Sequence, residues 1–266
     1  MQIEWIVAFL ALGCVVGFMA GLLGIGGGAI MVPVLTTIFI AQGIAIDKVV
    51  HLALGTSMAC IIVTSISSFR AHHAKGAVIW PIVKQISIGV LFGTFLATFI
   101  AAKANSLYLA TFFACFMALV AVQMFVNRQP KPHKQVPGKT GLIGAGTGIG
   151  GISALVSIGG GSLTVPYLVW HNVDIKKAIG TSAAIGFPIS VAGSAGYILN
   201  GWHNTVLENY TLGFVYLPAV LFISATSFFV APIGVKCAHV LPVGILKKVF
   251  AILMIVISFK MVHSII

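Results

Sequence analysis

Two glycine triplets are the residues of this sequence best suited to hold a ligand. Each triplet is followed five residues later by a proline, and the order recurs in both halves of the chain. Glycine runs break helices, and in a membrane an unwound backbone is tolerated only where it is buried in protein or lines a polar cavity. The helix that restarts after each break, at Ala29 and at Ser162, presents free N–H groups and a positive dipole end, which attract anions. Close helix packing is the alternative role for these glycines, which are Gly26, Gly27, Gly28, Gly159, Gly160 and Gly161.

A Gly-Thr-Ser motif also occurs twice, at residues 55–57 and 180–182. Hydroxyl groups can donate to an oxyanion without carrying a charge. In membrane helices Ser and Thr also commonly bond to the backbone or to a neighbouring helix, and the sequence leaves both roles open. We include four of these side chains with the glycines in a predicted anion site: Thr56, Ser57, Thr181 and Ser182.

Other chemically active side chains are sparse within the apolar runs. Carboxylates are absent at depth, which argues against a metal-ion site. The eight histidines fall at predicted edges or loops without ligand spacing, although they could carry protons, and the four cysteines show no paired spacing. We expect no metal, no cofactor and no catalytic residues. The four acidic residues all lie near predicted helix ends: Glu4, Asp47, Asp174 and Glu208.

The composition explains what must position these residues. The chain is 59% hydrophobic and 7% charged, with a mean hydropathy of +1.11. A soluble domain of 266 residues could not hide this apolar surface. Apolar runs of about 20 residues recur without the alternation of a barrel, so we expect an all-α polytopic membrane protein in a lipid bilayer. The net charge of +11 comes from basic residues between the runs, where they set orientation, and does not indicate nucleic-acid binding.

An internal repeat organises the chain. Residues 21–35 match residues 154–168 at an offset of 133, and residues 53–57 match 178–182 at an offset of 125. The matches indicate a duplicated unit of roughly 130 residues. We therefore divide the chain into an N-terminal membrane repeat (1–127), a basic, proline-rich linker (128–139) and a C-terminal membrane repeat (140–266).

Glycines upstream of each triplet form a second pattern. Gly13, Gly17 and Gly21 are spaced by four, and Gly146 and Gly150 repeat the spacing. This is the close-packing pattern of membrane helices, and we assign it that role. Residues 146–151 also fit the dinucleotide fingerprint G-x-G-x-x-G, but no strand pattern precedes them, so we reject that interpretation.

Each half is predicted to contain five helical segments. The second segment of each half is too short to span comfortably and follows the glycine triplet, so the first two segments should form a Gly-broken hairpin. The expected segments are 3–23, 29–41, 47–69, 78–101 and 106–127, then 140–157, 162–172, 175–198, 210–235 and 242–265.

The basic residues distinguish two topologies. If the hairpins return to the side they enter from, 12 Lys and Arg fall on one side and 3 on the other; if they span, the division is 8 against 7. The positive-inside rule favours the hairpin model, with the linker cytoplasmic and both termini periplasmic. Five segments per half give the halves opposite orientations, an inverted repeat typical of transporters. Parallel halves of four spans each remain the alternative.

The paired Gly-Gly-Gly-x-x-x-x-Pro motifs, the paired Gly-Thr-Ser motifs and the basic central linker resemble the TauE/SafE family over essentially the whole chain. That family is associated with passage of sulfite and organosulfonates across the bacterial cytoplasmic (inner) membrane. The resemblance implies a transporter that exports sulfite or a similar sulfur anion.

Several alternatives stay open at this stage. The chain could be an uptake permease for another small anion, or a non-transport subunit of a membrane complex. An intramembrane enzyme would need a nucleophile with a base, or paired aspartates, and no such pattern is recognisable. No ATP-binding loop is present, so transport would be driven by the membrane potential or by protons as coupling ion. The anion, the coupling ion and the oligomeric state are not fixed by the sequence.

Overall fold

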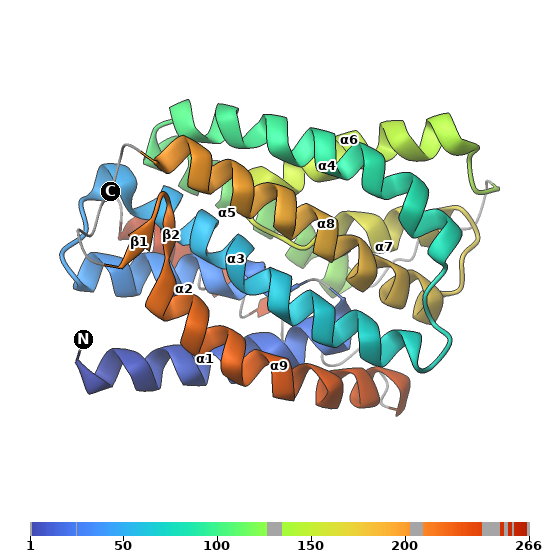
Figure 1. Ribbon diagram of the computed structural model, residues 1–266, viewed down its shortest axis with the longest axis horizontal. Helices are drawn as coiled ribbons and strands as arrows, with labels where there is room; N and C mark the ends of the chain where they lie inside the picture. The colour runs from blue at the N-terminus through green and yellow to red at the C-terminus, as the bar shows by residue number, and fades with distance from the viewer. Residues whose placement is uncertain are drawn as a thin grey trace.

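The chain folds into an all-α bundle in the computed structural model, which describes residues 2–24, 26–126, 135–202, 210–240, 251–252, 255–256 and 258–264. A short antiparallel hairpin interrupts the helices before α9, and further helical residues lie between 251 and 264. Figure 1 shows the helices running side by side along the longest axis. The elements are α1 (Ile3–Leu23), α2 (Gly28–Ala41), α3 (Ile46–His73), α4 (Trp80–Lys103), α5 (Ser106–Val126), α6 (Lys139–Val156), α7 (Gly161–Trp170), α8 (Ile175–Gly201), β1 (Thr211–Leu212), β2 (Val215–Tyr216) and α9 (Leu217–Val240).

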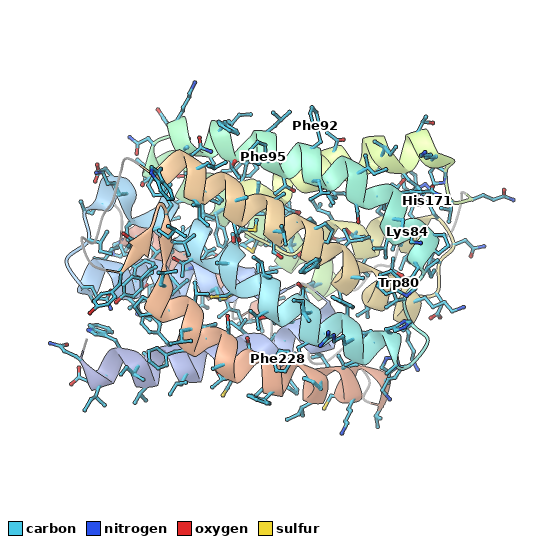
Figure 2. The ribbon with its side chains drawn as sticks, in the orientation of Figure 1. Trp80, Lys84, Phe92, Phe95, His171 and Phe228 are labelled. Atoms are coloured by element: carbon cyan, nitrogen blue, oxygen red, sulfur yellow. The ribbon has the colours of Figure 1, made fainter. Side chains whose placement is uncertain are left out.

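Six of these helices are long and apolar enough to cross a membrane: α1, α3, α4, α5, α8 and α9. Large hydrophobic side chains such as Phe92 and Phe229 point away from the bundle, where lipid would surround them (Figure 2 labels Phe92). In water this exposure would be unfavourable, whereas in lipid it has no cost. The chain is a multi-pass membrane protein, as its composition predicts.

The helix boundaries differ most from the sequence prediction at the end of α3 and at both ends of α9, which finishes at Val240 where residue 235 is predicted. The fourth segment of the second half was expected to begin at residue 210, but a hairpin turning at Gly213 (φ 56°) occupies 211–216 and α9 begins at Leu217. The third segment was expected to end at residue 69, yet α3 continues to His73. The predicted segment 242–265 lies largely outside the described residues, as does most of the 128–139 linker.

The first two helices of each half form a hairpin that returns to the end where it began. Phe9 near the start of α1 and Phe39 near the end of α2 both contact the ring of Tyr216, at centroid distances of 6.2 and 5.6 Å. In the second half, α6 begins and α7 ends at the opposite end of the molecule, where Figure 2 shows Trp80, Lys84 and His171 together.

We call these two ends the N-terminal end and the basic end. The N-terminal end carries Lys48 and Lys103 among the described helix termini. The basic end is where α3, α7 and α9 finish and where α4, α6 and α8 start (Figure 1). Its described basic residues are Arg70, Lys75, Lys84, Lys139, Lys176, Lys177 and Lys236.

The two halves interlock through their glycine stripes. Helix α1 packs most extensively on α9, α6 packs in the same way on α4, and α3 and α8 cross in the centre. A Cβ on Gly17 would lie 2.6 Å from the Cα of Ser227, and a Cβ on Gly150 would lie 2.6 Å from the carbonyl oxygen of Val90. Only glycine permits these approaches, so the predicted close-packing role of the stripes is confirmed.

Candidate functional site

Each hairpin turns through residues in the left-handed backbone region. In the first break, Gly24, Gly26 and Gly27 have φ values of 67°, 76° and 79°; in the second, Ser157 and Gly160 have φ values of 46° and 76°. Glycine adopts this conformation without a steric penalty, which is why the triplets can end one helix and start the next within a few residues.

The two breaks meet inside the protein. A Cβ on Gly26 would lie 3.0 Å from the Cα of Gly159, and a Cβ on Gly28 would overlap the carbonyl oxygen of Ser157. The hydroxyl of Ser157 donates to the carbonyl oxygen of Leu54 on α3 at 2.9 Å. The described residues of both triplets are buried, so the structure brings together the two glycine runs that the sequence singled out.

The starts of α2 and α7 lie at this meeting point. The first hydrogen bonds of α2 run from Ile30 and Met31 to the carbonyl oxygen of Gly27, and those of α7 run from Leu163 and Thr164 to that of Gly160. The N–H groups at the very start of each helix, including that of Ala29, have no carbonyl partner within their own helix. At the start of α7 the Ser162 residue is 8% exposed, and its hydroxyl is buried and has no partner among the described residues.

Thr56 and Thr181 occupy equivalent positions and make equivalent bonds. The Oγ1 of Thr56 accepts from the backbone N–H of Tyr216 at 2.9 Å, and the Oγ1 of Thr181 accepts from that of Ile79 at 3.0 Å. Tyr216 and Ile79 immediately precede α9 and α4. Each threonine therefore fixes the start of a helix that belongs to the other half.

The glycine before each threonine permits this contact. A Cβ on Gly55 would overlap the carbonyl oxygen of Phe214, and one on Gly180 would lie 2.5 Å from that of Ala77. The Gly-Thr-Ser motif is thus built into the contact between the halves. In these bonds Thr56 and Thr181 use only their oxygens as acceptors, so their hydroxyl hydrogens could still be donated to an anion. A role of the two threonines in anion binding stays a prediction.

Ser57 and Ser182 are equivalent in sequence but not in bonding. Ser182 donates to the carbonyl oxygen of Gly24 at 3.1 Å, which ties α8 to the first break. Ser57 is fully buried, and its hydroxyl has no partner in the part of the chain that the structure describes. A buried hydroxyl without a partner is costly in an apolar interior, which marks Ser57 as a group available to a ligand.

A narrow gap, too tight to hold a water molecule in this structure, lies between small residues beside the first break, toward the basic end; we call this gap the pocket. Sequence reasoning missed its walls from α3 and α8, because they depend on how these two helices face each other. The available signal was the spacing of Ser65 and Ser68, which are three residues apart and share one face of their helix. The residues that line the pocket are Ala20, Gly24, Gly26, Ser65, Ser68, Ala183 and Gly186.

The equivalent region toward the N-terminal end is filled. At the offset of 125, Ala183 and Gly186 correspond to Met58 and Ile61, both fully buried. The Met58 sulfur lies 2.8 Å from where a Cβ on Gly193 would be, and an Ile61 methyl lies 3.2 Å from the Cβ position of Gly26. Two large side chains therefore occupy the space that two small ones leave open at the basic end.

The site is polar without ionised side chains. None of the described Asp, Glu, Lys or Arg residues is buried. No group of three His, Cys, Asp or Glu among the described residues could hold a metal ion. What the arrangement offers is backbone N–H groups, hydroxyls and helix-dipole ends, which suit a small anion.

Comparison with known proteins agrees with this architecture. Residues 9–261 match the family model described as "Sulfite exporter TauE/SafE". The chain belongs to the TauE/SafE family. A Haemophilus influenzae protein named "Probable membrane transporter protein" is 36% identical over 259 residues, covering 97% of this chain and 98% of that protein.

Two more distant relatives carry similar names. A probable membrane transporter protein of Methanocaldococcus jannaschii is 28% identical, covering 84% of this chain and 83% of its own, and one of Bacillus subtilis is 27% identical, covering 72% and 78%. No solved structure matches the chain. With its apolar helices, this TauE/SafE protein is a multi-pass membrane transporter.

Proposed function

We propose that this TauE/SafE protein is a secondary transporter that exports a small sulfur-containing anion, sulfite or an organosulfonate, across the bacterial cytoplasmic membrane. The observation that carries the proposal is the contact between the two breaks at Gly26 and Gly159, where α2 and α7 both begin. The name of the family model supports a sulfur oxyanion as the substrate class.

Helix ends suit a transported anion better than a charged side chain does. An anion in the membrane interior loses its hydration, and a lone buried cation there would be costly to maintain. The N-termini of α2 and α7 supply positive potential from partial charges, and Ser57 and Ser162 can add hydroxyl donors. Partial charges also let the anion leave again, as a carrier requires.

The proposed direction of transport, export, rests on the name of the family model, and the basic residues support the orientation of the protein in the membrane. The positive-inside rule makes the basic end cytoplasmic, which leaves the N-terminus periplasmic and, by the same count, the C-terminus as well. The pocket lies toward the basic end, whereas Met58 and Ile61 fill the opposite side. This asymmetry supports a state in which the looser packing faces the cytoplasm. Helices of each half pack on helices of the other, which supports an inverted repeat that alternates between a cytoplasm-facing and a periplasm-facing state.

Purified protein in liposomes tests the proposal. Vesicles are loaded separately with sulfite, thiosulfate, methanesulfonate and chloride, and efflux is followed under an imposed membrane potential. We expect at least one sulfur anion to leave much faster than chloride and faster than from protein-free vesicles. Equal rates for all four anions, or hydrolysis of an added substrate without flux, would contradict the assignment.

A further inference from the structure

A buried histidine lies above the pocket, at the end of the same helix face. Ser65, Ser68 and His72 follow one another on α3 at spacings of three and four, so they share a face. Ser65 and Ser68 line the pocket, and the Ser68 hydroxyl lies 3.4 Å from the carbonyl oxygen of Ala20. Three polar side chains therefore follow one another on α3 between the first break and the basic end.

The hydrogen bonding of His72 fixes its tautomer. Its Nε2 lies 3.1 Å from the carbonyl oxygen of Gly21, the end of α1. A carbonyl oxygen only accepts, so Nε2 carries the hydrogen and Nδ1 of the neutral ring holds a lone pair. His72 is 1% exposed, and its Nδ1 has no partner among the described residues. The ring is therefore anchored at one nitrogen and open at the other.

A second histidine faces it from α9. The ring centroids of His72 and His239 are 5.6 Å apart, and the buried Nε2 of His239 also lacks a partner in the described part of the chain. The charged groups that act on the two rings are the cations Lys75, after α3, and Lys176, at the start of α8, and both favour the neutral form of the rings, so a bound anion would have to supply the countercharge for a proton. From α1 only the Gly21 carbonyl reaches His72. No described carboxylate faces the pair, so a structural ion pair does not account for it.

We propose that His72, with His239 beside it, is the proton-binding site of the transporter, and that the proton binds together with the anion and moves in the same direction. The proposal rests on the proposed function, because it names the coupling step of that same pathway. A proton from water at the basic end adds to Nδ1 of His72, while the Nε2–H bond to Gly21 is kept. The imidazolium then has a second N–H donor, on a residue one helical turn from Ser68, which lines the pocket.

The sign of the coupling follows from charge. An imidazolium and an anion a few ångströms apart stabilise each other, most strongly where water is excluded. Anion binding and proton binding are therefore mutually favourable, which predicts joint movement and opposes exchange of one for the other. When the anion leaves on the far side, the proton is lost to water there and His72 returns to the neutral tautomer.

Proton and anion fluxes measured together test this inference. Liposomes containing the full chain and an internal pH dye are loaded with methanesulfonate, which stays singly charged, or with sulfite. Wild type is compared with His72→Gln, whose amide can still donate to Gly21, and with His239→Gln. His73→Gln is the matched control, because His73 is exposed and its Nδ1 accepts from Trp80. Exchange of labelled for unlabelled anion is measured in the same vesicles.

The expected result is proton efflux with anion efflux in wild type and in His73→Gln. In His72→Gln and His239→Gln the ratio of protons to anions should fall at least tenfold and the pH dependence of flux should flatten, while exchange continues. The inference is overturned if wild type moves no protons or moves them in the direction opposite to the anion. It is also overturned if folded His72→Gln keeps the wild-type ratio of protons to anions. If wild type transports neither methanesulfonate nor sulfite, the proposed transport function is wrong, and that outcome is distinct from a failure of the proton-binding proposal.

Discussion

The Ser182 hydroxyl donates a hydrogen bond of 3.1 Å to the carbonyl oxygen of Gly24, and this bond joins the second half of the chain to the end of the first-half helix α1. Its sequence equivalent, Ser57, makes no such bond among the described residues. One serine therefore supports the break, and the other is left available for a ligand.

Alanine substitutions separate these two roles. Ser182→Ala should lower the free energy of unfolding by about 1 kcal/mol, the usual net contribution of one hydrogen bond. Ser57→Ala should leave stability unchanged or slightly raised, because it removes a buried hydroxyl without a partner. It should instead weaken anion affinity severalfold. Thermal unfolding in detergent and concentration-dependent flux measure the two effects, and equal loss of stability in both variants would refute the distinction.

Replacing Thr56 or Thr181 should lower the free energy of unfolding more than it lowers the affinity for the anion. Thr56→Ala and Thr181→Ala each leave a backbone N–H without its acceptor, at Tyr216 and Ile79, which should cost about 1–3 kcal/mol. Thr→Ser keeps the acceptor and should be close to wild type. If the threonines bind the anion, the other role that the sequence leaves open, each alanine variant would instead weaken anion binding by about 1 kcal/mol. Unfolding midpoints and flux together decide between them: lost affinity at unchanged stability would favour the binding role.

A larger side chain at Ala183 should block transport through the pocket. Ala183→Met places at this position the side chain that its equivalent, Met58, already carries on the other side. Methionine side chains would then fill both the pocket and the equivalent region on the other side, and we expect flux to fall more than tenfold. Val191→Leu on the exposed face of the same helix is the control. If Ala183→Met is well folded and transports at the normal rate, the anion does not pass through this pocket.

The orientation can be tested at two positions that lie at opposite ends. Asn105 between α4 and α5 lies at the N-terminal end, and Lys75 after α3 lies at the basic end. In a cysteine-free background, Asn105→Cys should react with an impermeant maleimide in intact cells, and Lys75→Cys only after permeabilisation. The reverse pattern would place the basic end outside and would contradict the proposed orientation.

Local features of the sequence were sufficient to predict the breaks. A glycine triplet followed by a segment of 14 or 10 residues cannot continue a spanning helix, and the structure has α2 and α7 where the short segments were expected. The close-packing stripes that include Gly17 and Gly150 were also predictable, because the spacing of each stripe can be recognised within a single helix.

Features that depend on the other half were not predictable. The backbone N–H groups that donate to Thr56 and Thr181 lie 160 and 102 residues away in the sequence, and no local pattern identifies them. The pocket exists because Ala183 happens to face Ser68, which requires the register of α8 on α3. His72 was assigned to a loop, yet α3 extends beyond the predicted end and buries it against Gly21.

Transport by glycine variants tests the central claim, that the anion binds where the two breaks meet. Gly27 and Gly160 have φ values of 79° and 76°; a Cβ on Gly27 would overlap Val16, and one on Gly160 would lie 2.6 Å from Ile189. Valine at either position should abolish sulfur-anion flux, since a β-branched residue resists this backbone conformation. Gly144→Val is the control, because nothing lies within 4 Å of its Cβ position. Flux should vanish in Gly27→Val and Gly160→Val and persist in Gly144→Val; normal flux in folded, inserted Gly27→Val and Gly160→Val would place the site elsewhere.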